Sequence, residues 1–147
     1  MNLSNKINLI LKDYSSGNKA SAYKKFKKIY LNNNRDIKLR YNLAVMQQEL
    51  GLLDEAESNY ISLIELSEDT KYKINLYNLY ITKGLYQKAL KLMNSIQSKN
   101  LSLIQVNQDK AYILYLLKNY NDSIIECNEI LKISRKNTNT LNTLGLC

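Results

Sequence analysis

Apolar residues recur along the chain at spacings of three and four positions, between short polar stretches. In one such stripe Ala56, Tyr60 and Leu63 follow one another at these spacings. Residues spaced in this way lie on one face of an α-helix, so each stripe predicts an amphipathic helix. The chain has no proline and only four glycines. Few helix breakers and little material for tight turns favour an all-α fold over an all-β one.

The predicted helices come in pairs that repeat. In each pair a turn residue is followed five positions later by a small residue. A larger apolar residue comes four positions after the small one, and another apolar residue comes three positions after that. The turn residues are separated by 34, 33 and 34 positions. In chain order the four sets are Gly17, Ala22, Phe26 and Ile29; Gly51, Ala56, Tyr60 and Leu63; Gly84, Ala89, Met93 and Ile96; and Lys118, Ser123, Cys127 and Ile130. We predict a unit of helix A, a turn, helix B and a polar link.

The residues around the turns fit this interpretation. Leu9, Leu43 and Leu76 take one equivalent position on the helix A that precedes each turn. Glycine is expected at the turn because it can end helix A in the left-handed conformation without a Cβ clash. Links at 32–34, 67–70 and 136–139 carry capping residues for the next helix A, and a less marked link lies near 98–102.

A period near 34 with this pattern resembles the tetratricopeptide repeat (TPR) family, most clearly from Tyr41 to Ile64. Tyr77 stands where a small residue is usual, Lys110 where leucine is usual, and Lys118 replaces the turn glycine. The resemblance implies an all-α, right-handed superhelical solenoid of antiparallel helix pairs. We expect a single domain over residues 1–147, with repeats at approximately 3–36, 37–69, 70–103 and 104–137 and a partial fifth at 138–147.

The partial fifth repeat reads as a helix A with no helix B after it. Leu141 and Leu144 would then lack the apolar cover that stacked repeats give one another. We interpret this end as an excerpt of a longer chain, as a truncated product, or as half of a self-association surface.

Several classes of chemistry are disfavoured by composition. The chain has no histidine, which removes imidazole bases, His-activated nucleophiles and His-containing zinc sites. No paired-carboxylate or phosphate-loop motif is present, so we expect no enzyme activity, no cofactor and no metal. Two cysteines make no disulfide framework, and Cys127 falls on an apolar helix position. No targeting segment or apolar run of about 20 residues is found, which favours a cytoplasmic protein without a membrane span.

The family resemblance also implies where a partner would bind, because helix A lines the concave face of such stacks. The residues that we expect in this partner-binding groove are Lys38, Tyr41, Asn42, Val45, Lys71, Asn75, Asn78, Gln108 and Tyr112. Asn8, Asn42 and Asn75 recur at one position, and amides can pair with the backbone of an extended peptide. The alternative is that asparagine recurs only because it is abundant in this chain.

Positive charge raises nucleic acid as a second class of partner. The formal charge is +8, yet residues 1–34 carry +6, residues 35–69 carry −5, residues 70–103 carry +6 and residues 104–137 carry +1. A strip that follows phosphates should not be interrupted by an acidic repeat. The cluster Lys24, Lys25, Lys27 and Lys28 is therefore interpreted first as a solvated outer face.

We therefore predict a protein–protein interaction scaffold that holds a partner peptide or protein on its helix-A face. Nucleic acid is the less favoured partner. The alternatives are an RNA-binding helical repeat that uses the lysine-rich surfaces, and the docking portion of a larger enzyme.

Overall fold

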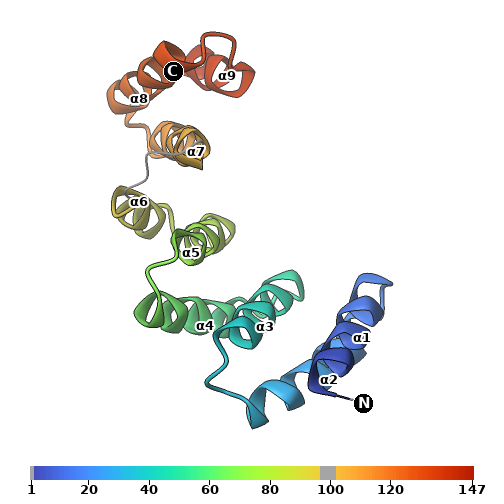
Figure 1. Cartoon of the computed structure of the whole chain (residues 1–147). Helices are drawn as coiled ribbons and strands as arrows, with labels where there is room; N and C mark the ends of the chain where they lie inside the picture. Colours follow the sequence, from blue (N-terminus) through green and yellow to red (C-terminus); the bar gives the residue numbers. More distant parts are fainter. Residues whose placement is uncertain (1, 97–101) are drawn as a thin grey trace. The chain divides into compact units, whose positions relative to one another are not determined.

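The computed structural model describes residues 2–96 and 102–147, and within these ranges the chain forms nine α-helices and no strand (Figure 1). The helices are α1 (Leu3–Ser15), α2 (Lys19–Asn32), α3 (Ile37–Glu49), α4 (Leu53–Leu66), α5 (Thr70–Thr82), α6 (Tyr86–Asn94), α7 (Ser102–Leu116), α8 (Tyr120–Ile133) and α9 (Thr138–Leu146). They form two compact units, 1–79 and 80–147, with the boundary near the end of α5. The expectation of one domain stays a prediction.

The helices follow the predicted repeat. Each odd-numbered helix is a helix A and begins at residue 3, 37, 70, 102 or 138, against predicted repeat starts at 3, 37, 70, 104 and 138. Asp36, Asp69 and Asn137 accept hydrogen bonds from backbone N–H groups at the start of α3, α5 and α9. These caps satisfy donors that a helix start leaves without an intrahelical partner. The predicted link near 98–102 falls largely on residues 97–101, which lie outside the described residues.

All four turns between helix A and helix B are closed in one way. At the second turn, Leu52 donates its backbone N–H to the carbonyl of Gln47 at 2.9 Å, and Gly51 donates to Gln48 at 3.1 Å. This pair of bonds is a Schellman motif, which requires a left-handed residue after the helix. The residues at that place and their φ angles are Gly17 (105°), Gly51 (75°), Gly84 (70°) and Lys118 (61°). Lys118 therefore takes a backbone conformation that disfavours any residue with a Cβ.

Burial confirms the phase of the repeat. The small residues after the turns, Ala22, Ala56, Ala89 and Ser123, are each 0% exposed. The apolar residues four and seven positions further on are also buried in all four repeats, although Ile96 of the third lies just after α6. Small side chains at the first position let helix B approach helix A closely, and the larger ones fill the space beyond.

In the first unit, α1 packs on α2, α2 on α3 and α3 on α4. One apolar cluster joins the first three helices, and it includes Ile10, Phe26 and Leu43. Tyr14 lies in this cluster and donates its hydroxyl to a carboxylate oxygen of Glu49 at 3.1 Å. Burial raises the pKa of Tyr14 to about 12. The contact ties the first repeat to the second.

In the second unit, α7 packs on α6, α8 and α9, and the residues that depart from the family pattern are accommodated. Lys110, in the position of Leu43, forms a partly buried ion pair with Glu126 of α8. Ser123, in the position of Ala56, donates its hydroxyl to the carbonyl of Ala111 at 2.7 Å. Each polar side chain thus has a partner, which removes most of the cost of burying it.

Candidate functional site

One set of helix-A residues, here called the groove positions, carries the predicted partner-binding side chains. Within each helix they follow one another at spacings of three, one and three, which places all four on one face. They are Lys38, Tyr41, Asn42 and Val45 in α3; Lys71, Ile74, Asn75 and Asn78 in α5; Gln105, Gln108, Asp109 and Tyr112 in α7; and Asn139, Asn142, Thr143 and Leu146 in α9.

In the first unit, groove positions of α3 and α5 contact one another. The rings of Tyr41 and Tyr72 lie 5.5 Å apart between centroids, and the Lys71 ammonium lies 5.5 Å and 4.9 Å from the two centroids. Asn75 donates its amide nitrogen to the Tyr41 hydroxyl at 3.3 Å and to the Lys71 carbonyl at 2.8 Å. We call Tyr41, Lys71, Tyr72 and Asn75 the tyrosine–lysine cluster. Its members are held by one another without any ligand.

The positive charge in this cluster, on Lys71, is also paired with a carboxylate. The Lys71 ammonium lies 2.7 Å from a carboxylate oxygen of Asp69. This contact raises the pKa of Lys71 and lowers the pKa of Asp69. A peptide carboxylate at Lys71 would therefore compete with an ion pair that already exists.

The three asparagines of the predicted amide ladder lie in different surroundings. Asn8 is exposed, whereas Asn42 and Asn75 are half-buried. Asn75 uses its amide nitrogen within the tyrosine–lysine cluster. The Asn42 side chain makes no hydrogen bond with the part of the chain that the structure describes. Equal spacing in the sequence therefore does not give the three amides equal availability.

Groove positions of the second unit line an open groove. The space between α7 and α9 measures about 280 Å³. Its lining consists of Gln105, Gln108, Asp109, Tyr112, Asn139, Asn142, Thr143 and Leu146. Each α9 residue in this set stands 34 positions after one of the α7 residues. The groove is thus built from the same four positions of two consecutive repeats, and we call it the α7–α9 groove.

Gln108 holds the two walls of the groove together. Its amide nitrogen donates to the side-chain oxygen of Asn137 and to the Thr140 hydroxyl, the latter at 3.3 Å. Asn137 in turn caps α9 by accepting from the Thr140 backbone N–H at 3.0 Å. Gln108 is therefore a positioning residue that fixes the start of α9 against α7.

The other lining side chains present both polar and apolar atoms. Tyr112 is 46% exposed, and its ring stacks on Tyr115 at 6.2 Å between centroids. Gln105 donates to an Asp109 carboxylate oxygen at 2.9 Å, while Asn142 is exposed. Amides offer both a donor and an acceptor, as a peptide backbone does. The exposed tyrosine ring and Leu146 at 55% exposure add apolar contact area.

The structure therefore brings some predicted site residues together and separates others. Tyr41, Lys71 and Asn75 meet in the tyrosine–lysine cluster, and Gln108 and Tyr112 meet in the α7–α9 groove. The remaining predicted residues are the exposed Lys38 and the half-buried Asn42, Val45 and Asn78. Sequence analysis missed the α9 wall formed by Asn139, Asn142, Thr143 and Leu146. Extending the period by one more step from α7 would have found it.

The lysine-rich face of α2 is solvated, as predicted. Lys24, Lys25, Lys27 and Lys28 are all exposed, and with Leu31 they border a space of about 390 Å³. The lining contains no aromatic ring on which a base could stack. Its chemistry is that of a cationic outer surface.

No helix within residues 2–96 and 102–147 combines the length and the apolar character needed to cross a bilayer. Within the same ranges, no three side chains of the metal-ligating types lie close enough together to hold an ion.

Comparison with known proteins identifies the fold. No family model and no curated protein matches the sequence. The crystal structure of a tetratricopeptide repeat protein from Parabacteroides merdae is 21% identical with a TM-score of 0.84, and the match covers 95% of this chain and 56% of that one. MamA is 13% identical with a TM-score of 0.78, over 92% of this chain and 80% of its own.

A third structure contains the nearly identical TPR-like repeats of a putative kinesin light chain from Podospora anserina. It is 13% identical with a TM-score of 0.72, over 96% of this chain and 81% of its own. This chain spans little more than half the length of the Parabacteroides merdae protein. The likeness establishes the fold: the chain is an all-α helical repeat of the tetratricopeptide type, as the sequence pattern predicted.

Proposed function

We propose that this chain is a non-catalytic protein–protein interaction scaffold that holds a peptide segment of a partner protein in the α7–α9 groove. The observation that carries the proposal is the lining of that groove by the same four positions of two consecutive repeats. Helical-repeat proteins bind partners on extended surfaces that successive repeats build in this way. The proposal keeps the cytoplasmic location expected from the sequence.

The chemistry of the groove favours an extended peptide. Amide groups of Asn139 and Asn142 on one wall and of Gln105 on the other can pair with backbone N–H and C=O groups. Tyr112 and Leu146 offer apolar contacts to side chains that point into the groove. Asp109 disfavours an acidic residue beside it. A neutral or basic segment with one apolar anchor is the ligand that fits best.

The test compares two double variants in affinity capture from host lysate, each with and without nuclease. Tyr112→Ala with Asn142→Ala removes an exposed ring and an exposed amide from the groove. The control, Leu66→Ala with Asn94→Ala, removes an exposed apolar side chain from α4 and an exposed amide from α6. Both pairs leave the buried core intact.

We expect the groove variant to lose a defined set of proteins that the wild type and the control retain, whether or not nuclease is present. The loss should be about tenfold or more, since a well-packed tyrosine contributes more than about 1 kcal/mol at an interface. Equal capture by both variants would refute the groove. A bound set that disappears with nuclease would instead support RNA binding through the lysine surfaces.

A further inference from the structure

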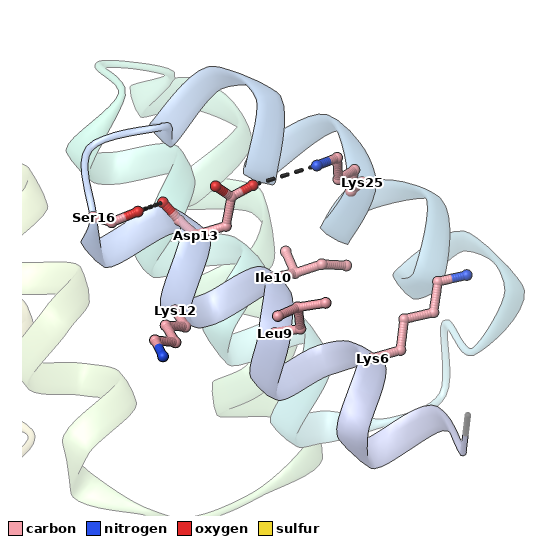
Figure 2. Close-up of a pocket in the computed structure, with 7 residues that line it drawn as sticks. All are labelled: Lys6, Leu9, Ile10, Lys12, Asp13, Ser16 and Lys25. Carbon is pink, nitrogen blue, oxygen red and sulfur yellow. Dashed lines mark hydrogen bonds and ion pairs between the residues drawn. The ribbon is translucent and has the colours of Figure 1, made fainter.

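A second hollow lies on α1, and none of the groove positions contributes to its lining. It measures about 550 Å³, and Leu9 and Ile10 form its apolar floor. Figure 2 shows these two side chains at the centre, with Lys6 toward the N-terminal end of α1 and the Asp13–Lys25 pair toward the other end. We call this site the α1 hollow.

The repeat itself indicates what shape fits the α1 hollow. Leu9 is 59% exposed, whereas Leu43, at the same position of the next repeat, is 2% exposed. Leu43 is buried in the cluster that contains Phe26 and Ile29 of α2, which is the helix B of the preceding repeat. In the second repeat, this face of helix A is therefore covered by another helix. A helix is the shape expected to cover Leu9.

The rim of the α1 hollow is cationic. Lys6 and Lys12 are exposed, and neither forms an ion pair with the residues that the structure describes. Lys25 is paired with Asp13 at 3.3 Å, so the acidic group on the rim is already neutralised. A helix that seats here would need apolar residues toward Leu9 and carboxylates toward the two unpaired lysines.

This chain presents such a helix on its own surface. On α8, Asp122, Ile125, Glu129 and Ile133 are spaced by three, four and four residues, so they lie on one face. Ile125 is 58% exposed and Ile133 is 73% exposed, and both acidic residues are exposed as well. Glu129 pairs with Lys132 and Asp122 accepts a hydrogen bond from Asn119. Both contacts are at the surface, where such pairs contribute little, so they can be exchanged for contacts to a partner. We call these four residues the α8 stripe.

The α8 stripe differs from the same positions of the first two B helices. In α4 the equivalent residues are Glu55, Ser58, Ser62 and Leu66, with only one acidic and one apolar side chain. Counting back 101 residues, which superimposes Cys127 on Phe26, the equivalent α2 residues are Ser21, Lys24, Lys28 and Asn32. None of these is apolar or acidic. Two isoleucines at more than half exposure, with carboxylates between and beside them, therefore complement a cationic rim around an apolar floor.

We propose that the α1 hollow of one copy of this chain receives the α8 stripe of a second copy. Ile125 and Ile133 cover Leu9, while Asp122 and Glu129 face Lys6 and Lys12. The contact joins two different surfaces, so each copy keeps one free hollow and one free stripe. Association through such a heterologous contact continues from copy to copy unless it is blocked or closes into a ring.

Sedimentation velocity of the full chain over a wide range of concentration tests this proposal. Wild-type protein should form a growing series of oligomers that shrinks when salt screens the charged rim. Leu9→Glu should block the hollow, and Ile125→Asp with Ile133→Asp should block the stripe, so that each variant stays monomeric. Leu66→Glu, at a residue with 56% exposure on α4, is the matched control and should associate as wild type does.

Mixing the two blocked variants gives the sharpest result. One keeps an intact stripe and the other an intact hollow, so the mixture should form a dimer that grows no further. The blocked surfaces are both acidic and repel each other. Circular dichroism of each variant should match the wild type because all three substituted residues are mostly exposed. A monomeric wild type, a blocked variant that still associates, or a mixture that stays monomeric would each overturn the proposal.

Discussion

The tyrosine–lysine cluster and the α7–α9 groove occupy the same positions of the repeat, yet they differ in what their side chains contact. In the cluster, Tyr41, Lys71 and Asn75 contact one another across α3 and α5. In the groove, Tyr112 and Asn142 face an open space of about 280 Å³. The position in the repeat decides where a side chain faces. The size and chemistry of its neighbours decide whether it remains available to a partner.

The largest expected effect is on the free energy of unfolding, which should fall more for a substitution in the cluster than for one in the groove. Tyr41→Ala should destabilise the first unit by about 2 kcal/mol, because a half-buried ring loses its aromatic, lysine and amide contacts. Tyr112→Ala should cost less than about 0.5 kcal/mol, because its ring is 46% exposed.

Hydrogen exchange measured by mass spectrometry resolves the two units separately. Protection of α3 and α5 should fall about thirtyfold in Tyr41→Ala, while α7 and α8 keep theirs. Equal losses in the two variants would mean that the cluster and the groove do not differ in the way described.

A smaller effect compares the turns of the two units. Lys118 has φ 61°, where the first three turns have glycine. Lys118→Gly should stabilise the second unit by about 1 kcal/mol, because glycine takes the left-handed conformation without a Cβ clash. Gly51→Ala, the reverse change in the first unit, should destabilise by a similar amount. Urea unfolding of both variants measures this, and a Lys118→Gly protein that is no more stable would show that the turn carries no strain.

The smallest expected effect is on the stability of the first unit at acid pH. Glu49 accepts from the Lys19 ammonium at 2.9 Å, and this contact lowers the pKa of Glu49. A carboxyl group with a lowered folded pKa stabilises the protein above its unfolded pKa, and this contribution is lost as the pH falls through the folded value.

Stability should therefore change little from about pH 6 to 8, where the unperturbed carboxyl and lysine groups do not titrate, and fall below about pH 4.5. Glu49→Gln should reduce this loss of stability by less than about 1 kcal/mol, because Lys19 and Glu49 are both nearly half exposed. Urea unfolding of the wild type and the variant across this pH range measures the difference. Identical acid curves would remove Glu49 as a contributor.

The period of the sequence was sufficient to predict the fold, because each element of the repeat has a local physical cause. Left-handed turns need glycine, as at Gly51, and close helix contact needs a small residue, as at Ala56. Those rules placed the start of α3 at residue 37, as the structure has it. They also predicted the buried face of every helix B that is described.

The sites were less predictable because they depend on contacts between repeats. The family resemblance placed Tyr41 on the groove face, but nothing in its own helix indicates that Lys71 and Asn75 of α5 would contact it. The exposure of Leu9 depends likewise on a neighbour that equal spacing with Leu43 does not reveal. The period was also not followed into α9, so Asn142 was missed.

Photocrosslinking from inside the groove tests the central claim most directly. A benzoylphenylalanine replaces Tyr112 in one protein and the exposed Leu66 of α4 in the other, and both are irradiated in nuclease-treated host lysate. The proposed function predicts that position 112 captures a partner protein that position 66 does not, and that Asn142→Ala weakens this capture. Capture of the same partner from position 66 alone would contradict it and would place the partner at α4.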